Sequence, residues 1–89
     1  MNKGRSYSVK LLPAAQKDLD RIPEKLRLRI EKNIRSLEDK PRPHGCRKLS
    51  GTINVYRVRV GDYRILYRVF DKERIVNISR IPPRSQAYR

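Results

Sequence analysis

The sequence is poor in cysteine, histidine and large aromatic side chains, and these shortages exclude several kinds of site. Its 89 residues contain one Cys, one His, one Phe and no Trp. Because Cys46 stands alone, an internal disulfide is impossible, and we expect a protein of a reducing compartment, the cytoplasm. One His and one Cys with scattered acids cannot build a metal site, and no phosphate-binding loop or dinucleotide fingerprint is present. We therefore expect neither a metal nor a cofactor.

Acidic residues and long apolar runs are also scarce. Nine Asp and Glu stand against 23 Lys and Arg, which gives a formal net charge of +14. Residues 13–40 are close to balance with six acids and eight bases, whereas residues 47–89 have three acids and eleven bases. No apolar run approaches membrane-spanning length, so we expect no membrane partner. The charge predicts that the C-terminal half binds an anionic partner, such as nucleic acid or an acidic protein.

The N-terminal half predicts a strand followed by a helical hairpin. Apolar and polar residues alternate from Tyr7 to Leu11, which is the period of a strand. Helical spacing predicts a helix from Pro13 to about residue 21, and Pro23 ends it and begins a second helix. The apolar stripe of this second helix is Leu26, Ile30, Ile34 and Leu37. The following segment 40–46, KPRPHGC, predicts a loop whose charges are solvated.

Residues 55–69, VYRVRVGDYRILYRV, predict a β-hairpin. Gly61-Asp62 suits a tight two-residue turn, and this turn places Arg59 opposite Arg64. One face is then apolar and consists of Tyr56, Val58, Val60, Tyr63, Ile65, Tyr67 and Val69. The other face gathers Arg57, Arg59, Arg64 and Arg68 around Leu66. Like charges opposite each other destabilise a strand pair, so this face calls for an anionic partner; the alternative is the ordinary solvated outer face of a sheet.

The order of the elements predicts the fold class. A last strand over residues 74–81 ends at Pro82-Pro83. The chain, 1–89, is then a single α+β domain with an N-terminal strand, a helical hairpin and an antiparallel sheet of three to four strands. The helices cover one face of this sheet. The other face stays open and carries Arg57, Arg59 and Arg64.

Arginines on an open sheet favour chemistry on a phosphodiester. Guanidinium groups bind phosphate with two hydrogen bonds and can stabilise the extra negative charge of a pentacovalent transition state. RNA supplies its own nucleophile, the 2′-hydroxyl, so a protein can cleave it without a metal by positioning that oxygen and neutralising charge. DNA lacks this route. The pattern is therefore more compatible with RNA cleavage, or with binding alone, than with DNA cleavage.

Two stretches, KLSGTINVYRVRVGDYRILYRV and IVNISRIPPRSQAY, resemble the RelE branch of the RelE/ParE toxin superfamily, and the likeness extends from Ala14 to Tyr88. The resemblance implies a type II toxin that cleaves mRNA in the ribosomal A site and leaves a 2′,3′-cyclic phosphate. Its implied partners are an acidic RelB-like antitoxin, the ribosome and mRNA. Two alternatives remain: a ParE-like toxin that inhibits DNA gyrase without cleavage, and a basic RNA-binding module.

The resemblance also implies which residues act. The implied catalytic set is Arg57, Arg59, Arg64, Arg84 and Tyr88. Arg57 and Arg64 would stabilise the phosphate, Arg84 would assist the leaving oxygen, and Tyr88 would stack on or orient the nucleotide. We expect further RNA contacts from Arg47, Lys48, Arg68, Arg80 and Arg89. The family pattern has lysines at positions 57 and 59, and arginine is a poor general base. The proton acceptor is therefore Tyr88 or ribosomal RNA, or catalysis rests on positioning and charge.

Overall fold

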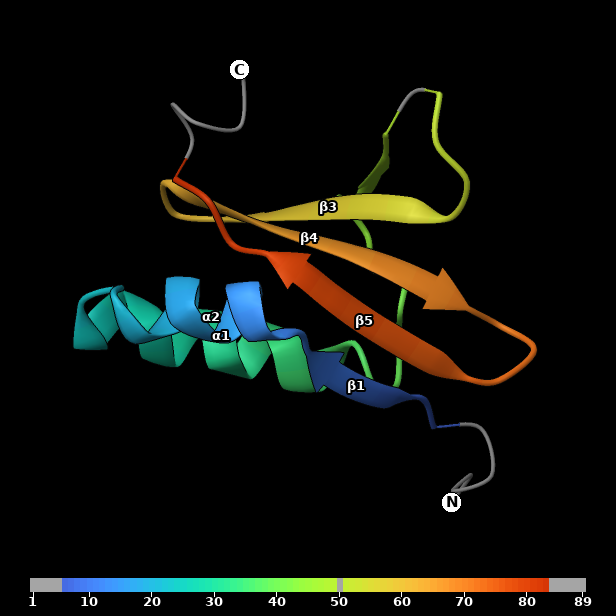
Figure 1. Ribbon diagram of the computed structural model, residues 1–89, viewed down its shortest axis with the longest axis horizontal. Helices are drawn as coiled ribbons and strands as arrows, with labels where there is room; N and C mark the ends of the chain where they lie inside the picture. The colour runs from blue at the N-terminus through green and yellow to red at the C-terminus, as the bar shows by residue number, and fades with distance from the viewer. Residues whose placement is uncertain (1–5, 50, 84–89) are drawn as a thin grey trace.

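The computed structural model describes residues 6–49 and 51–83, in which two helices lie on one side of a five-stranded sheet (Figure 1). The elements are β1 (Ser8–Leu11), α1 (Pro13–Asp20), α2 (Glu24–Ser36), β2 (Arg47–Lys48), β3 (Val55–Val60), β4 (Tyr63–Phe70) and β5 (Ile75–Arg80). The predicted α+β class, the N-terminal strand and the helical hairpin are confirmed. Neither helix of the described chain has the length and apolar character needed to cross a membrane.

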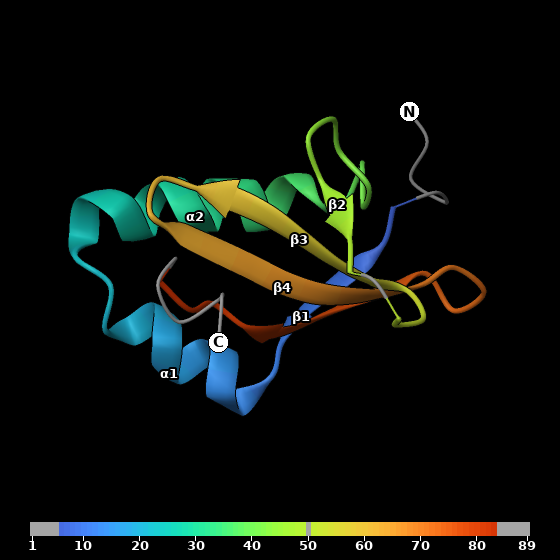
Figure 2. The same ribbon diagram turned by 90° about the horizontal axis from the view of Figure 1, so that it is seen from above.

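The sheet is mixed. Its strand order is β1-β5-β4-β3-β2. The four strands after the helices are antiparallel, as predicted, whereas β1 runs parallel to β5 and pairs Val9 with Val76. Parallel neighbours need a long connection between them, and here the helical hairpin and three strands provide it (Figure 2). The N-terminal strand is thus the edge of the same sheet that carries the arginines.

The predicted register of the β3–β4 hairpin is confirmed. Val60 pairs with Tyr63, Arg59 with Arg64, and the pairing continues in step to Val55 and Arg68. Gly61 has a φ of +60°, which suits the first central residue of a type II′ turn. The turn therefore fixes which side chains share a face, and this register alone places the arginines on one side of the hairpin.

We expect Gly61→Ala to lower the free energy of unfolding by about 1–2 kcal/mol, because an L-residue is strained at this φ. An added Cβ would also lie 3.0 Å from Leu26 Cδ1 of α2. Gly51→Ala is the matched control, since its φ is +73° but a Cβ there meets nothing within 4 Å. Urea unfolding of both variants measures the difference. A smaller loss at Gly61 than at Gly51 would contradict the account.

The apolar face of the sheet packs against both helices and forms the core. Its buried members are Ala15, Leu19, Ile22, Ile30, Ile34, Leu37, Val60, Ile65, Tyr67, Val69, Val76, Ile78 and Ile81. Tyr67 stacks on Tyr56 with ring centroids 5.9 Å apart. Both helices lie on this face of the sheet (Figures 1 and 2).

Candidate nucleic-acid interface

A small hollow lies on the face of the sheet away from the helices, and we call it the basic hollow. Its volume is about 150 Å³, and the described residues that line it are Gly45, Arg47, Arg57, Arg59 and Arg64. Three neighbouring strands supply the four arginines, and the loop before β2 supplies the glycine. Small-molecule pockets usually exceed about 300 Å³. The basic hollow therefore suits an anionic group such as a phosphate rather than a whole cofactor.

Like charges face each other across this part of the sheet. Arg59 is the Cα partner of Arg64, as predicted, and Arg47 is the partner of Arg57. The second pair was not predicted, because the sequence does not set the register between β2 and β3. Directly opposed like charges destabilise a strand pair. An anion bound between Arg47 and Arg57 would offset their repulsion, so this face suits an anionic ligand.

The arginines of the basic hollow differ in depth. Arg59 is exposed and Arg57 is half-buried, while Arg64 is only 2% exposed. This corrects the expectation that Arg64 lies on an open surface. The chain after β5 returns beside β4, where the Arg64 backbone N–H donates to Pro82 O at 3.0 Å and Tyr63 forms a bridge with Pro83. Arg64 therefore lies deeper in the hollow than Arg57 and Arg59.

The structure separates the other expected RNA contacts from the basic hollow. Lys48 is exposed on β2 and does not line the hollow. Arg68 lines a different depression of about 290 Å³ further along the same sheet face. Arg84, Tyr88 and Arg89 lie outside the described residues.

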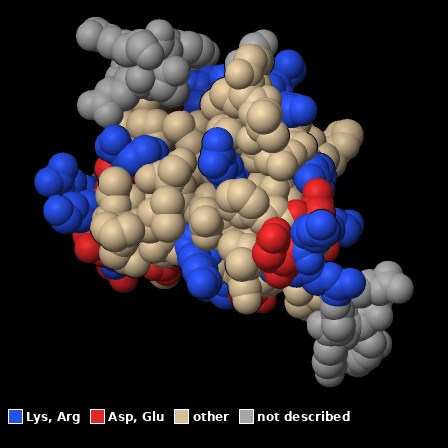
Figure 3. Space-filling model, turned by 45° about the vertical axis from the view of Figure 1, so that its right-hand side comes forward, with Lys and Arg blue, Asp and Glu red and all other residues tan. Residues whose placement is uncertain are grey.

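Lys and Arg side chains are spread across the face shown in Figure 3, and acidic ones are fewer. The described residues also contain no group of three His, Cys, Asp or Glu that could hold a metal ion.

Arg80 makes a structural contact with helix α1. Its Nε lies 2.7 Å from Asp18 Oδ2, and the backbone N–H of Ile81 donates to the same oxygen at 2.8 Å. The hydrogen bond from Arg80 is the main reason why the pKa of Asp18 is lowered, against the opposing effect of burial. Arg80 thus joins the end of β5 to α1. Its expected contact with RNA stays a prediction.

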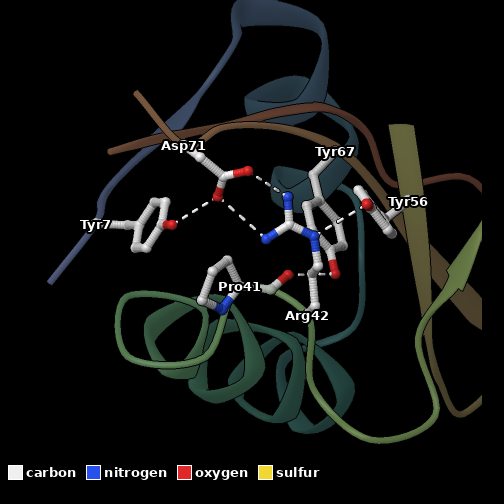
Figure 4. Close-up of polar contacts among 6 residues, drawn as sticks. All are labelled: Tyr7, Pro41, Arg42, Tyr56, Tyr67 and Asp71. Atoms are coloured by element: carbon white, nitrogen blue, oxygen red, sulfur yellow. Dashed lines mark hydrogen bonds and ion pairs between the residues drawn. The ribbon is translucent and has the colours of Figure 1, made fainter. Parts of the chain in front are cut away.

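A polar cluster that the sequence did not predict holds the loop before β2 (Figure 4). Arg42 Nη1 and Nη2 donate to the two carboxylate oxygens of Asp71 at 3.1 and 2.7 Å, and Arg42 Nε donates to Tyr56 Oη at 2.9 Å. Tyr7 Oη donates to Asp71 Oδ1 at 2.6 Å. We call these four residues the Arg42 clamp. Of the charges that were expected to be solvated in this loop, Arg42 is thus ion-paired, although its side chain stays 37% exposed.

Local spacing gives no signal for the clamp. Arg42 and Asp71 are 29 residues apart, and Tyr7 and Asp71 are 64 apart. The arginine stands between two prolines in a loop, and the aspartate stands in the β4–β5 turn. Only the assembled sheet brings the two segments together.

The clamp shifts the pKa of its members. Hydrogen bonds from Arg42 and then from Tyr7 lower the pKa of Asp71 to about 2. The hydrogen bond to Asp71 raises the pKa of Tyr7, and the same carboxylate raises that of Arg42. Beside the clamp, burial raises the pKa of Tyr67, whose hydroxyl donates to Pro41 O at 2.9 Å. At neutral pH these pKa shifts favour the ionised carboxylate of Asp71 and the protonated forms of Tyr7, Arg42 and Tyr67, which are the forms that make the hydrogen bonds.

We expect the stabilising contribution of Asp71 to disappear as the pH falls from about 4 to about 2. An unfolded chain protonates an aspartate near pH 3.9, whereas the folded pKa of Asp71 is about 2. The unfolded state therefore binds the proton first, and stability falls with pH in this window. The measurement is the free energy of unfolding against pH for the native chain and Asp71→Asn. Their difference should shrink below pH 4; parallel curves down to pH 2 would refute the assignment.

Comparison with known proteins gives a consistent result. A family model described as the ParE toxin of the type II toxin–antitoxin system parDE matches residues 9–88. Toxin RelE of Mycobacterium tuberculosis is 31% identical over 90 residues, which cover 100% of this chain and 93% of the relative. Toxin RelG of the same organism is 33% identical over 87 residues, which cover 93% and 97%. In the crystal structure of the archaeal RelE-RelB complex from Pyrococcus horikoshii, one chain matches with a TM-score of 0.81 and 32% identity, covering 91% of this chain and 98% of that one.

Proposed function

Because the chain belongs to the RelE/ParE family of type II toxin–antitoxin toxins, we propose that it is a ribosome-dependent endoribonuclease that cleaves mRNA in the decoding site. The observation that carries the proposal is the basic hollow, where three strands bring four arginines together on the face away from the helices. The identity with RelE and RelG toxins supports the RelE branch. The expected substrate group is a single phosphodiester of ribosome-bound mRNA.

In the proposed reaction, RNA supplies both the nucleophile and the leaving group. The 2′-oxygen attacks the adjacent phosphorus, the bond to the 5′-oxygen breaks, and the upstream fragment keeps a 2′,3′-cyclic phosphate. The phosphoryl oxygens gain charge in the transition state, and fixed guanidinium groups stabilise that charge. Arg64 suits this role because it is buried in the hollow, and Arg57 lines the same hollow. Arg59, which is exposed, is placed to hold a neighbouring phosphate.

Residues outside the described chain complete the proposed set. Arg84 assists the departing 5′-oxygen, and Tyr88 stacks on or orients the nucleotide. The proton of the 2′-hydroxyl passes to Tyr88 or to ribosomal RNA, or the reaction depends on positioning and charge alone. Arginine keeps its proton at neutral pH, so Arg57 and Arg59 serve as electrostatic groups rather than as bases.

The proposed protein partner is an acidic RelB-like antitoxin. The P. horikoshii neighbour is a RelE-RelB complex. The net charge of +14 suits an acidic partner, whose binding would relieve the repulsion among the arginines.

A second candidate is inhibition of DNA gyrase without cleavage. The observation that favours it is the matching family model, which is described as a ParE toxin. An inhibitor that acts by protein contact does not need opposed arginines around a hollow of phosphate size. The basic hollow therefore weighs toward RNA cleavage.

Incubation with translating ribosomes, followed by mapping of mRNA 5′ ends, tests the proposal. Cuts in phase with codons that disappear in Arg64→Ala would support it. Intact mRNA together with inhibited DNA supercoiling would favour the second candidate. If both assays are silent and Arg57→Ala changes only the salt dependence of RNA binding, the chain is an RNA-binding module.

A further inference from the structure

We propose that the Arg42 clamp is a positioning device for the basic hollow, which it controls through the loop that supplies Gly45 and Arg47. Its expected effect on cleavage rests on the proposed function, whereas its effect on the loop and on RNA affinity does not. The clamp residues do not line the hollow among the described residues. They would therefore act through the loop and without touching the RNA.

The clamp joins three parts of the fold to one side chain. Asp71 comes from the β4–β5 turn, Tyr7 from the segment just before β1, and Tyr56 from β3. Figure 4 shows the guanidinium of Arg42 between the carboxylate and the Tyr56 hydroxyl. The carbon Cζ of Arg42 also lies 5.2 Å from the centre of the Tyr56 ring. Directed contacts on several sides fix the position of the guanidinium, and with it the start of the loop.

The loop from Arg42 to Arg47 is short and held at both ends. Arg42 precedes Gly45 by three residues, and Arg47 begins β2 and pairs with Arg57. Between these ends, the Cys46 N–H donates to Pro43 O at 3.0 Å, and Gly45 has a φ of +94°. A loop fixed at both ends over so few residues has little freedom. Gly45 and Arg47, which line the hollow, are therefore positioned by the clamp at one end of the loop and by the sheet at the other.

The far end of the loop is anchored by a short strand. Strand β2 has two residues and lies at the edge of the sheet, so few ladder hydrogen bonds hold Arg47 opposite Arg57. These residues also repel each other as like charges. Without the clamp, Arg47 would move away from Arg57 and open the hollow. The clamp thus holds together charges that would otherwise separate.

A purely stabilising role explains the clamp less well. The side chains of Arg42 and Asp71 are 37% and 54% exposed, and exposed ion pairs contribute little to global stability. Their geometric effect is larger, because a misplacement of about 1 Å at a reacting centre can cost about 100-fold in rate. Substitutions in the clamp can separate positioning from the plain effect of removing a charge, and then from a loss of folding.

The decisive comparison is Asp71→Asn against Glu73→Gln, two substitutions in the same turn that each remove one negative charge. Charge alone predicts that both bind RNA more tightly. Positioning predicts that Asp71→Asn binds a labelled single-stranded RNA more weakly and cleaves with a kcat/KM lower by about tenfold or more. Glu73→Gln should bind as tightly as the native chain or more tightly. If the two variants behave alike, the proposal is wrong.

Two further variants separate positioning from folding. Tyr7→Phe removes one hydroxyl without a change of charge and should give a smaller loss in the same direction. Arg42→Lys keeps the charge but cannot make the directed set of hydrogen bonds, so it should not restore native affinity. Amide hydrogen exchange at Cys46, whose N–H donates to Pro43 O, should speed up in each clamp variant while amides of β4 stay protected. Unchanged exchange in the loop would overturn the proposal.

The outcomes distinguish this inference from the proposed function. If the native chain cuts no mRNA on ribosomes, the nuclease assignment fails, and the exchange and RNA-affinity comparisons still decide the clamp. If the native chain cuts mRNA and Asp71→Asn cuts it equally well, the clamp inference alone fails.

Discussion

Arg57→Ala is expected to lower the rate of mRNA cleavage on the ribosome by about 100- to 1,000-fold, the usual cost of removing one fixed donor from a developing oxyanion. Arg57 lines the basic hollow from β3, half-buried between the strands that carry Arg47 and Arg64. The same substitution should leave the melting temperature unchanged or slightly raised, because it removes one of the two opposed arginine pairs. The cleavage rate would then fall without any loss of thermal stability. The measurements are cleavage on programmed ribosomes under single-turnover conditions and thermal unfolding.

Two control variants sharpen this prediction. Arg57→Lys keeps the charge and loses the planar fork of donors, so its rate should fall between those of the native chain and Arg57→Ala. Arg35→Ala removes one positive charge from the exposed side of α2, in the helical layer, and should cleave at the native rate. If Arg57→Ala is no slower than Arg35→Ala, the basic hollow is not where the reaction takes place.

The sequence predicted the parts of the fold that depend on neighbouring residues. The hairpin is the clearest case, because a two-residue turn at Gly61-Asp62 and strict alternation leave only one register. That register is enough to place Arg57, Arg59 and Arg64 on one face. Helix boundaries followed in the same way from Pro13 and Pro23, since proline suits the first turn of a helix.

What the sequence did not predict depends on contacts between distant segments. The parallel pairing of β1 with β5 arises when the helices pack, and alternation gives no partner for an edge strand. The return of the chain beside β4, where Pro82 accepts a hydrogen bond from the Arg64 backbone and Pro83 forms a bridge with Tyr63, is such a contact, and the pattern gave no sign that Arg64 is buried. The bond between Arg42 and Asp71 joins a loop and a turn, where composition correctly predicts irregular structure but not its contacts. The sequence thus predicted the part of the candidate site that lies on β3 and β4, but not the part formed by the loop before β2.

The largest expected effect on stability is at Tyr67, the residue that connects the core to this loop. Tyr67 lies fully buried on β4, between β3 and β5. Removing a buried aromatic ring costs about 3–5 kcal/mol, and a domain of this size has about 5–15 kcal/mol in total. Tyr67→Ala should therefore shift the urea midpoint strongly downward or leave the chain largely unfolded.

Tyr67→Phe separates the ring from the hydroxyl. This variant keeps the packing on Tyr56 and loses the hydroxyl, with its hydrogen bond to Pro41 O. An unpaired, partly buried carbonyl costs about 1–3 kcal/mol, so the loss should be well below that of Tyr67→Ala. Because Pro41 directly precedes Arg42, Tyr67→Phe should also speed amide exchange in the loop at Cys46, whose N–H donates to Pro43 O. Equal losses in the two variants would mean that the hydroxyl, and not the ring, carries the stability of this part of the core.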